Sequence, residues 1–372
     1  MRVVSVTLRD FRSYTRAEAH LGGGLTVVHG PNGAGKSNLL EAIFFGCTGY
    51  ALRTRNDREL LRFGTEASRV TLAVLDGPER HELSVGYGVL AGSEKPLKRM
   101  RVDGAIVERL VDVETRPLLG VFLPDRLELV KGPPAPRRAH LDRLIAAIWP
   151  LRTATRRSYA RALAQRNALL AGIRTGRASR ATLDSWDCEL ARHAIALRDD
   201  RAAATELLQE PFARHGALLG LGGTIELRYR PRTRAANAEQ FLVELRERLD
   251  SELERGFGAH GPHRDEVLFL REGRELRTYG SQGEQRVALL ALLLAERTVL
   301  AEHRGRTPLL LLDDVMSELD AQRRELLVRE LATGGQSVIA TTDLAHVPGA
   351  CGPEVTRLRV SAGAILQEAL AA

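Results

Sequence analysis

The sequence predicts an α/β fold with a mixed sheet, an additional antiparallel β region and a compact helical lobe inserted in the middle of the chain. Near the start, a short apolar strand at 25–29, a glycine-rich turn and a helix at 36–46 form one strand–turn–helix unit. Near the end, continuous apolar runs at 309–312 and 337–341 are typical of parallel strands covered on both faces. Long segments rich in Ala, Leu and Arg lie between these parts and are typical of helices.

The remaining elements follow from the same patterns. Short runs separated by Gly and Pro predict an antiparallel meander early in the chain. Strands are expected at 3–8, 69–75, 81–87, 225–229 and 266–270, and helices at 137–149, 153–173, 182–210, 285–301 and 321–331. We therefore divide the chain into an N-terminal part of the α/β domain at 1–117, an inserted helical lobe at 118–250, and a C-terminal part at 251–372.

Composition sets limits on location and partners. Of the 372 residues, 44% are hydrophobic, which is enough for two packed units. No apolar stretch approaches the roughly 18 residues of a membrane helix, and the first residues lack the apolar centre of a signal peptide, so we expect a cytoplasmic protein without a membrane partner. The net charge of +7 fits a polyanionic partner, although many proteins are mildly basic. The cysteines, Cys47, Cys188 and Cys351, are far apart, which removes support for a zinc hook or a disulfide framework.

The segment 30-GPNGAGKS-37 matches a phosphate-binding loop at every fixed position. Glycines let successive N–H groups point inward, and the following helix N-terminus adds its positive dipole end. Lys36, one of only four lysines in an arginine-rich chain, is expected to reach the β- and γ-phosphates. Ser37 is expected to bind Mg²⁺. The residues predicted to contact a nucleotide here are Gly30, Pro31, Asn32, Gly33, Ala34, Gly35, Lys36 and Ser37.

Two acids end the apolar run 309-LLLL-312, where ligands bind in parallel sheets. We assign Asp313 to Mg²⁺ and Asp314 to the attacking water, against the alternative of two solvated acids. The next strand ends in Thr341, Thr342 and Asp343, each a candidate sensor of the γ-phosphate, against the equally supported alternative of a polar strand end. The acids are followed by 317-SELD-320, whose S-x-x-D spacing also suits a helix cap.

The segment 281-SQGEQR-286 precedes an apolar helix and has two possible interpretations. Ser281 and Glu284 have the spacing of a capping box. Gly283, however, weakens the first helical turn unless another molecule must approach the backbone closely. We therefore predict a second anion site that serves the nucleotide of another copy of the chain. A metal site at His260, His263 and Asp265 is not favoured, since the cluster lacks a second ligand pair.

This ordered set of motifs, from 30-GPNGAGKSN-38 through SQGEQR, LLLLDD and SELD to TTD, resembles the ABC-type ATPase heads of the SMC and Rad50 group. Within that group, 10-DFRSY-14, 122-FLPDRLELVKGPPAPRR-138 and 261-GPHRDE-266 resemble segments of the RecF family of bacterial recombination mediators. The resemblance covers nearly the whole chain and implies the fold of a P-loop ABC-type ATPase head. It also implies that GPHRDE lines a dimer or nucleotide interface.

The resemblance implies that ATP and Mg²⁺ bind between two subunits and hold a homodimer together. Arg12 and Asn38 are then expected to contact the nucleotide of their own subunit, and Ser281 and Gly283 that of the partner subunit. The implied function is recombinational DNA repair and replication-fork maintenance, in which the dimer clamps double-stranded DNA or ss/dsDNA junctions near gaps and helps to load the recombinase. The implied protein partners are RecO and RecR.

The resemblance also implies a DNA-stimulated ATPase whose hydrolysis releases the dimer, and two departures from ABC ATPases imply that this hydrolysis is slow. Asp314 stands where Glu is usual, and Thr342 stands where His is usual. No clear glutamine loop is present, and Asp125 or Arg126 is the candidate for its place.

DNA contacts are expected from the inserted lobe and should be largely independent of sequence. Each candidate arginine has the alternative of a solvated helix face. The candidates are Arg137, Arg138, Arg156, Arg157 and Arg161. Two other functions remain open: the ATP-binding subunit of a transporter, disfavoured by the helical insertion, and a non-hydrolysing structural clamp on DNA.

Overall fold

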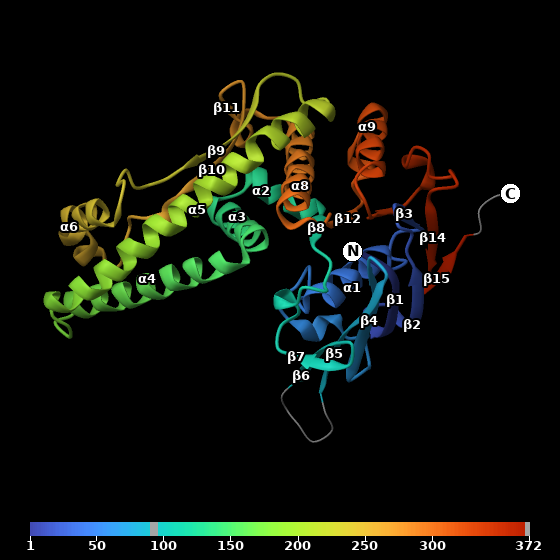
Figure 1. Ribbon diagram of the computed structural model, residues 1–372, viewed down its shortest axis with the longest axis horizontal. Helices are drawn as coiled ribbons and strands as arrows, with labels where there is room; N and C mark the ends of the chain where they lie inside the picture. The colour runs from blue at the N-terminus through green and yellow to red at the C-terminus, as the bar shows by residue number, and fades with distance from the viewer. Residues whose placement is uncertain (90–95, 369–372) are drawn as a thin grey trace. The chain divides into compact units, whose positions relative to one another are not determined.

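The computed structural model describes residues 1–89 and 96–368. The chain forms two compact units, unit 1 of residues 1–126 and 300–372 and unit 2 of residues 127–299 (Figure 1). No helix of the described residues is long and apolar enough to cross a membrane.

Unit 1 contains an antiparallel sheet with the strand order β2-β1-β4-β5-β6-β7. Alternating apolar residues of its strands face inward, as the strand pattern of period two predicts. The predicted strands at 3–8, 69–75 and 81–87 are confirmed. The strand bounds are β1 (Arg2–Phe11), β2 (Tyr14–His20), β4 (Ala67–Asp76), β5 (Glu79–Val89), β6 (Pro96–Val102) and β7 (Ala105–Val107).

The second sheet of unit 1 is mixed and has the order β15-β14-β3-β13-β12-β8. Strand β3 runs parallel to β13 and β14, and β12 runs parallel to β13 and β8, so the carboxyl ends of these strands share one edge. Helix α1 (Lys36–Thr48) shares one apolar core with strands of both sheets. The bounds are β3 (Leu25–His29), β8 (Leu119–Phe122), β12 (Leu309–Asp313), β13 (Ser337–Thr341), β14 (Thr356–Ser361) and β15 (Ala364–Gln367), with α9 (Ala321–Ala332) between β12 and β13.

Unit 2 is mainly helical and has its own apolar cluster around Tyr159, Leu190 and Phe241. Its sheet is antiparallel, with the order β11-β10-β9. The helices are α2 (Glu128–Lys131), α3 (Pro134–Ile148), α4 (Thr153–Arg174), α5 (Leu183–Leu218), α6 (Ala238–Arg255), α7 (Leu276–Tyr279) and α8 (Gln282–Arg304), whose last residues, from Leu300 on, belong to unit 1. The strands are β9 (Ile225–Arg230), β10 (Glu266–Arg271) and β11 (Arg274–Glu275).

The compact units divide the chain differently from the boundaries at 117/118 and 250/251 drawn from the sequence. Residues 251–299 belong to unit 2 rather than to the α/β unit. The reason is the pairing of β10 with β9, which ties the segment after 250 to the segment before it through Leu268 and Arg228. An apolar run reveals a strand but not its partner, so the pattern alone could not place this pair. Which segments act as the ATPase head stays a prediction.

Candidate nucleotide-binding site

The glycine-rich loop follows β3 at the shared carboxyl edge of the mixed sheet of unit 1. Gly30, Gly33 and Gly35 have positive φ of 150°, 76° and 118°, a region that favours glycine. At Gly30 a side chain would also meet the Val360 carbonyl oxygen, because a Cβ atom there would lie 2.1 Å from it. The loop therefore has the open backbone that a phosphate cradle needs, and α1 starts directly after it at Lys36.

The side chain of Lys36 contacts the backbone of the loop itself. The Lys36 ammonium donates hydrogen bonds to the carbonyl oxygens of Gly30 and Pro31, at 2.8 and 2.9 Å. Burial lowers the pKa of Lys36, and the carboxylates of Asp314 and Asp313 oppose that shift. The Lys36 charge thus stays beside the loop, between its carbonyls and the acids at the end of β12.

Asp313, the last residue of β12, forms a hydrogen bond with the loop. Strand β13 lies between β12 and β3, the strand that precedes the loop. The Ser37 hydroxyl donates a hydrogen bond to Asp313 Oδ1 at 2.9 Å, across 276 residues of sequence. Burial raises the pKa of the Asp313 carboxyl, and the hydrogen bond from Ser37 opposes that shift. The structure therefore brings together the two residues that the sequence predicts as Mg²⁺ ligands. Hydroxyl and carboxylate oxygens are the hard donors that Mg²⁺ prefers, so the pair fits this ion.

Asp314 follows directly and has an unusual backbone. Its φ is 50°, in the left-handed region that non-glycine residues seldom adopt, and its N–H donates to the Ala340 carbonyl at 3.0 Å. Within the described part of the chain, its buried Oδ1 has no hydrogen-bond partner. A buried carboxylate oxygen without a donor is costly to keep, which is typical of an oxygen reserved for a ligand or a reacting group.

The strand end at 341–343 lies next to the loop, since Thr341 pairs with His29 in the register of β13 and β3. The Thr341 hydroxyl is used internally and donates to the Asp343 carbonyl oxygen at 3.0 Å. Asp343 in turn accepts a hydrogen bond from the Ala345 N–H at 2.9 Å. Thr342 is half-buried and follows the strand end, so of the three residues it is the one whose side chain suits the predicted sensor.

A second group of residues supports the loop, and it joins the predicted Arg12 and Asn38 to Glu41 and Arg53, which were not predicted. Glu41 of α1 is fully buried and accepts hydrogen bonds from Arg12 at 3.0 and 3.2 Å and from Arg53 at 2.7 Å. Burial alone would raise the pKa of Glu41, but these arginines hold it below its ordinary value. Asn38 joins the group by accepting from Arg53 at 2.7 Å. The available signal was Glu41 itself, a single acid in the apolar run 39-LLEAIFF-45.

Tyr14 is a further contact that the sequence did not indicate. Its hydroxyl donates to the Gly35 carbonyl oxygen at 2.9 Å, and burial raises its pKa. The Ser13 hydroxyl accepts from the Asn38 side chain at 2.9 Å. The predicted motif 10-DFRSY-14 therefore lies against the loop, with Arg12 paired to Glu41.

The segment 281-SQGEQR-286 belongs to unit 2, whereas the phosphate loop belongs to unit 1. The predicted capping box is confirmed: the Ser281 N–H donates to Glu284 Oε2 at 2.7 Å, and the Glu284 N–H donates to Ser281 Oγ at 3.3 Å. Helix α8 begins at Gln282, three residues earlier than predicted. Ser281 remains exposed at the start of this 23-residue helix, which leaves the positive end of its dipole accessible.

Asp320 caps the helix that follows the paired acids. Its side chain accepts a hydrogen bond from the Arg323 N–H at 2.9 Å at the start of α9. Ser317 does not take part in the cap, because its hydroxyl donates to the Asp314 carbonyl oxygen at 2.8 Å. Asp125, a candidate for the glutamine-loop position, is exposed just after β8, beside the edge where β12 ends.

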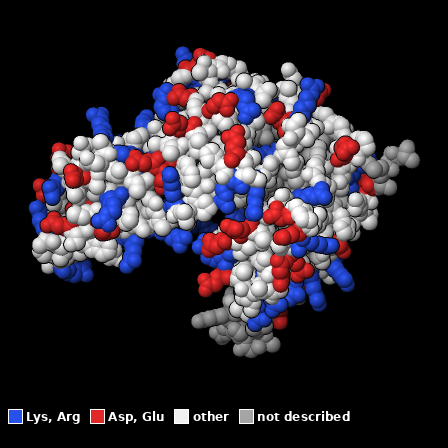
Figure 2. Space-filling view, in the orientation of Figure 1, with Lys and Arg blue, Asp and Glu red and all other residues white. Residues whose placement is uncertain are grey.

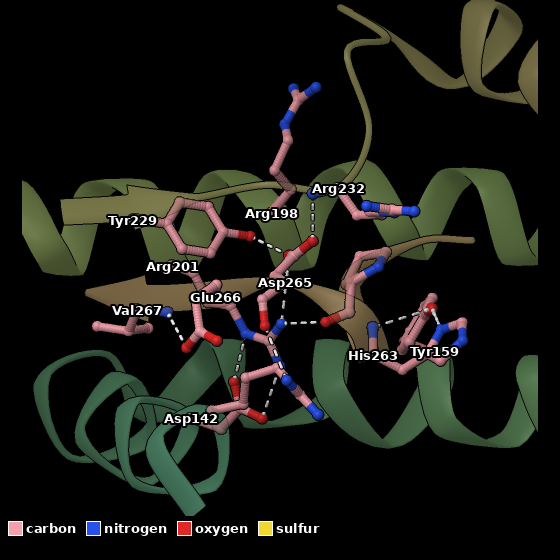
Figure 3. Close-up of polar contacts among 12 residues, drawn as sticks. Asp142, Tyr159, Arg198, Arg201, Tyr229, Arg232, His263, Asp265, Glu266 and Val267 are labelled. Atoms are coloured by element: carbon pink, nitrogen blue, oxygen red, sulfur yellow. Dashed lines mark hydrogen bonds and ion pairs between the residues drawn. The ribbon is translucent and has the colours of Figure 1, made fainter. Parts of the chain in front are cut away.

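The segment GPHRDE contributes a buried polar network in unit 2 (Figure 3). Asp265 is fully buried, and its carboxylate accepts hydrogen bonds from the Tyr229 hydroxyl and from the Arg232 N–H at 2.7 Å. Arg201 joins Asp265 to Asp142, donating to the latter at 2.8 and 3.0 Å. The Asp265 carboxylate is therefore occupied by this internal network. Whether the exposed part of the segment lines an interface stays a prediction.

The candidate DNA-contacting arginines differ in their exposure to solvent. Arg137 is buried and pairs with Glu266 at 2.8 Å, so its guanidinium is not available at the surface and this candidate is withdrawn. Arg138 is half-buried and donates to the Asp265 carbonyl oxygen at 2.7 Å. The exposed candidates are Arg156, Arg157 and Arg161 of α4. Figure 2 shows Lys and Arg side chains spread over the end of unit 2 formed by α4, α5 and α6, with acidic side chains among them.

The chain is similar to several known proteins. A family model described as an AAA domain matches residues 5–104, which include the phosphate loop. The DNA replication and repair protein RecF of Streptomyces avermitilis is 37% identical over 98% of this chain and 99% of its own length. RecF of Myxococcus xanthus is also 37% identical, over 98% of this chain and 97% of its own.

Solved structures show the same likeness. A structure of the recombination mediator protein RecF with ATP, in the RecFOR pathway, superposes with a TM-score of 0.84 at 27% identity and covers 99% of this chain and 97% of its own. An SMC head bound to a winged-helix domain of ScpA superposes with a TM-score of 0.58 at 16% identity and covers 100% of this chain and 98% of its own. This likeness shows the fold alone. The predicted fold class, an ABC-type ATPase head with a helical lobe, is confirmed.

Proposed function

Because this chain belongs to the RecF family of DNA replication and repair proteins, we propose that it is an ATP-dependent DNA-binding protein of recombinational repair and replication-fork maintenance. ATP binding drives a homodimer that clamps double-stranded DNA near gaps and at junctions with single strands. The dimer helps to load the recombinase, with RecO and RecR as partners. The similarity to a solved mediator of the RecFOR pathway supports this role. No observation favours a transporter subunit, since the relatives align along the helical lobe as well.

The observation that carries the nucleotide assignment is the contact between Ser37 and Asp313. Two oxygen donors from distant parts of the sequence meet at 2.9 Å, directly after a phosphate loop with a buried lysine. In the proposed complex both oxygens bind Mg²⁺, and backbone N–H groups of the loop hold the phosphates. Bound Mg²⁺ supplies charge neutralisation to the phosphate oxygens. Lys36 then exchanges its contacts with the loop carbonyls for the terminal phosphates.

Hydrolysis is assigned to the strand ends on either side of this contact. The buried Oδ1 of Asp314 is the acceptor for a proton of the attacking water, and Thr342 contacts the γ-phosphate from the neighbouring strand. Asp is one methylene shorter than Glu, and a threonine hydroxyl cannot take up a proton as an imidazole can. Both features support a weak ATPase, which DNA binding to the closed dimer would stimulate.

Dimerisation is assigned to the exposed start of α8. Ser281 and Gly283 contact the γ-phosphate of the ATP bound to the partner subunit, with the helix dipole adding attraction for the anion. ADP lacks the group that both subunits contact, so it cannot stabilise the closed dimer to the same degree.

The test is the mass of the full chain by light scattering with Mg²⁺ and ATP, ADP or neither, with and without duplex DNA. Wild-type protein should dimerise with ATP only. Ser281→Arg should remain a monomer with ATP, because the arginine fills the approach to the helix start, and should still bind ATP. Ser179→Arg is the matched control, since Ser179 is also an exposed capping serine of unit 2, and it should dimerise normally.

Two results would contradict this assignment. Wild-type protein that stays monomeric in all conditions would exclude the ATP-driven dimer. Ser281→Arg that dimerises like the wild type would show that Ser281 only caps its helix, and then the variant should lose only about 1 kcal/mol of stability.

A further inference from the structure

Four arginines, Arg9, Arg16, Arg69 and Arg99, form a row across the outer face of the antiparallel sheet of unit 1. Arg9 of β1 lies opposite Arg16 of β2 on one side and opposite Arg69 of β4 on the other. The row continues through Gly86 of β5 to Arg99 of β6. Residues directly opposite each other on antiparallel strands share a face, with Cβ atoms about 5 Å apart. At about 4.8 Å per strand, this arginine row spans roughly 19 Å.

The arginine row does not stabilise the sheet by itself. Like charges directly opposite each other on neighbouring strands are destabilising. In the described part of the chain, Arg16, Arg69 and Arg99 form no ion pair, and Arg9 only approaches Asp10, at 3.9 Å. A polyanion lying along the row would offset the repulsion, so the charge pattern is complementary to a chain of phosphates.

The sheet is hollowed beside the arginine row. An open hollow of about 570 Å³ has Thr71, Ser84 and Gly86 on its lining. Gly86 lies between Arg69 and Arg99 in the row, and Thr71 and Ser84 lie in the adjacent row. These small residues keep the middle of the face low, so a ligand backbone can approach the sheet between the flanking guanidinium groups. The hollow therefore has the shape of a shallow channel with basic walls.

Acidic residues limit the hollow along the strand direction. Glu66 and Glu82 also contribute to the lining. Glu66 precedes Arg69 by three positions and Glu82 precedes Gly86 by four, which is about 10 and 13 Å along the strands at 3.3 Å per residue. Arg101, opposite Ser84, also lines the hollow, and so does Asp10 beside Arg9. The positive charge is thus held between Glu66 and Glu82, in the row and at Arg101, and a bound polyanion would follow the row rather than the strands.

An exposed aromatic side chain lies on the loop next to this face. Phe63 is fully exposed, at 102% of its reference area, in the loop before β4. The loop is fixed against β1 and β2, because the Arg62 N–H donates to the Asp10 carbonyl oxygen at 2.9 Å and the Arg62 guanidinium to Thr15 Oγ1 at 2.7 Å. Thr65 of the same loop lines the hollow. Phe63 adds nothing to the core, but beside a basic channel it offers a face on which an unpaired base can stack.

We propose that this face binds a single-stranded segment of nucleic acid, with the arginine row along its phosphates and Phe63 stacked on a base. Stacking on an exposed side chain needs an unpaired base, which favours a single strand over a duplex. The inference rests on the DNA binding proposed above and deepens it, because it assigns the single-stranded arm of a junction to unit 1. It does not depend on ATP or on the dimer.

The test measures fluorescence anisotropy of the full chain at low salt, with a labelled oligothymidine without nucleotide and with a blunt duplex hairpin in the presence of Mg²⁺ and ATP, each of about 20 nucleotides per strand. Arg69→Glu should weaken oligothymidine binding about tenfold or more and leave duplex binding within about twofold. Phe63→Ala should weaken oligothymidine binding about tenfold, and Phe63→Trp should restore it. Arg80→Glu is the matched control, with the same charge change at an exposed residue of β5 about 20 Å from Gly86, and should change binding less than twofold.

Each other outcome has a defined meaning. If the wild type binds duplex but not oligothymidine, or if Arg69→Glu leaves oligothymidine binding unchanged, this inference is wrong and the proposed function stands. If Arg80→Glu weakens binding as much as Arg69→Glu, only net charge matters. Equal loss of duplex binding would make the face a general DNA surface, and altered sedimentation of Phe63→Ala without loss of oligothymidine binding would make it a contact between copies. Wild-type protein that binds no oligothymidine without nucleotide overturns this inference, and the proposed function is contradicted only if the protein also binds no duplex with Mg²⁺ and ATP.

Discussion

Asp314 shows how a single residue can be prepared for chemistry by its neighbours. A positive φ at a non-glycine residue costs on the order of 1 kcal/mol or more, and a buried oxygen without a donor adds to this cost. The hydrogen bond from the Asp314 N–H to Ala340 holds the residue in this conformation at the end of β12. The next residue in the chain, Val315, is fully buried, so the backbone on that side cannot relax easily.

Asp314→Asn should therefore separate hydrolysis from binding. The amide has nearly the same shape but is a poor proton acceptor, so ATP turnover should fall about a hundredfold or more, while ATP still drives dimerisation. Phosphate release and light scattering measure the two effects in one preparation. Asp112→Asn, at an exposed acid of the same unit, is the control and should leave both unchanged. Unchanged turnover in Asp314→Asn would remove this residue from the catalytic role, and a wild type without turnover would favour the non-hydrolysing clamp.

The residues of the site differ in how far the sequence could predict them. The contact between Ser37 and Asp313 followed from motif order and from the rule that parallel strands bind ligands at their carboxyl ends. The group around Glu41 did not follow, because a buried carboxylate becomes tolerable only when Arg12 and Arg53 reach it from other parts of the chain. The pattern of α1 shows an acid in an apolar run but cannot show its partners.

At the scale of elements, most of the long helices and the continuous apolar strands were predictable, whereas helix α6 and several strands were not. The apolar runs of β3, β12 and β13 are continuous because both faces are covered. Strands β2 and β6 carry few apolar residues, since one face of each is exposed, and they were missed. The strands β9 and β10 were found, but their pairing with each other was not, because it depends on the return of the chain after α6.

Helix α4 is the element that best supports a duplex-binding role for unit 2. Its 22 residues include five arginines and no acid, and Arg157 and Arg161 lie one turn apart on its exposed side. Arg166 is excluded from this role because it is buried against Asp187 and Glu252, at 2.5 Å from each. Because α4 contains no acidic residue, no carboxylate of the helix neutralises the charges of Arg157 and Arg161. The phosphates of a DNA backbone would neutralise them.

Replacing both Arg157 and Arg161 by alanine should weaken duplex binding at every sequence to a similar degree. The slope of the logarithm of affinity against the logarithm of salt concentration should fall by about two, one for each lost phosphate contact. The measurement is an anisotropy titration at several salt concentrations with ATP present. Arg192→Ala, at an exposed arginine of α5 paired with Glu189 at 3.2 Å, is the control. An unchanged slope would assign both arginines to a solvated helix face.

At the scale of the whole molecule, the two units are built differently. Unit 1 is assembled from both ends of the chain, and its core joins α1 and β1 to β12 and β13. Unit 2 is one continuous stretch with separate apolar clusters and buried ion pairs. Each unit therefore has the internal contacts of a cooperative folding unit, and only unit 1 contains the phosphate loop.

Calorimetry of the Ser281→Arg variant should show two unfolding transitions, of which only one responds to Mg²⁺ and ATP. A ligand at 100 times its Kd stabilises the unit that binds it by about 2.7 kcal/mol, so the transition of unit 1 should move up while that of unit 2 stays in place. In the wild type both transitions should move, because Ser281 and Gly283 of unit 2 then contact the ATP of the partner subunit. Lys36→Ala is the control for nucleotide binding and should show no shift in either transition. A shift of both transitions in Ser281→Arg would mean that the units unfold together, and a shift of neither would contradict ATP binding by the loop.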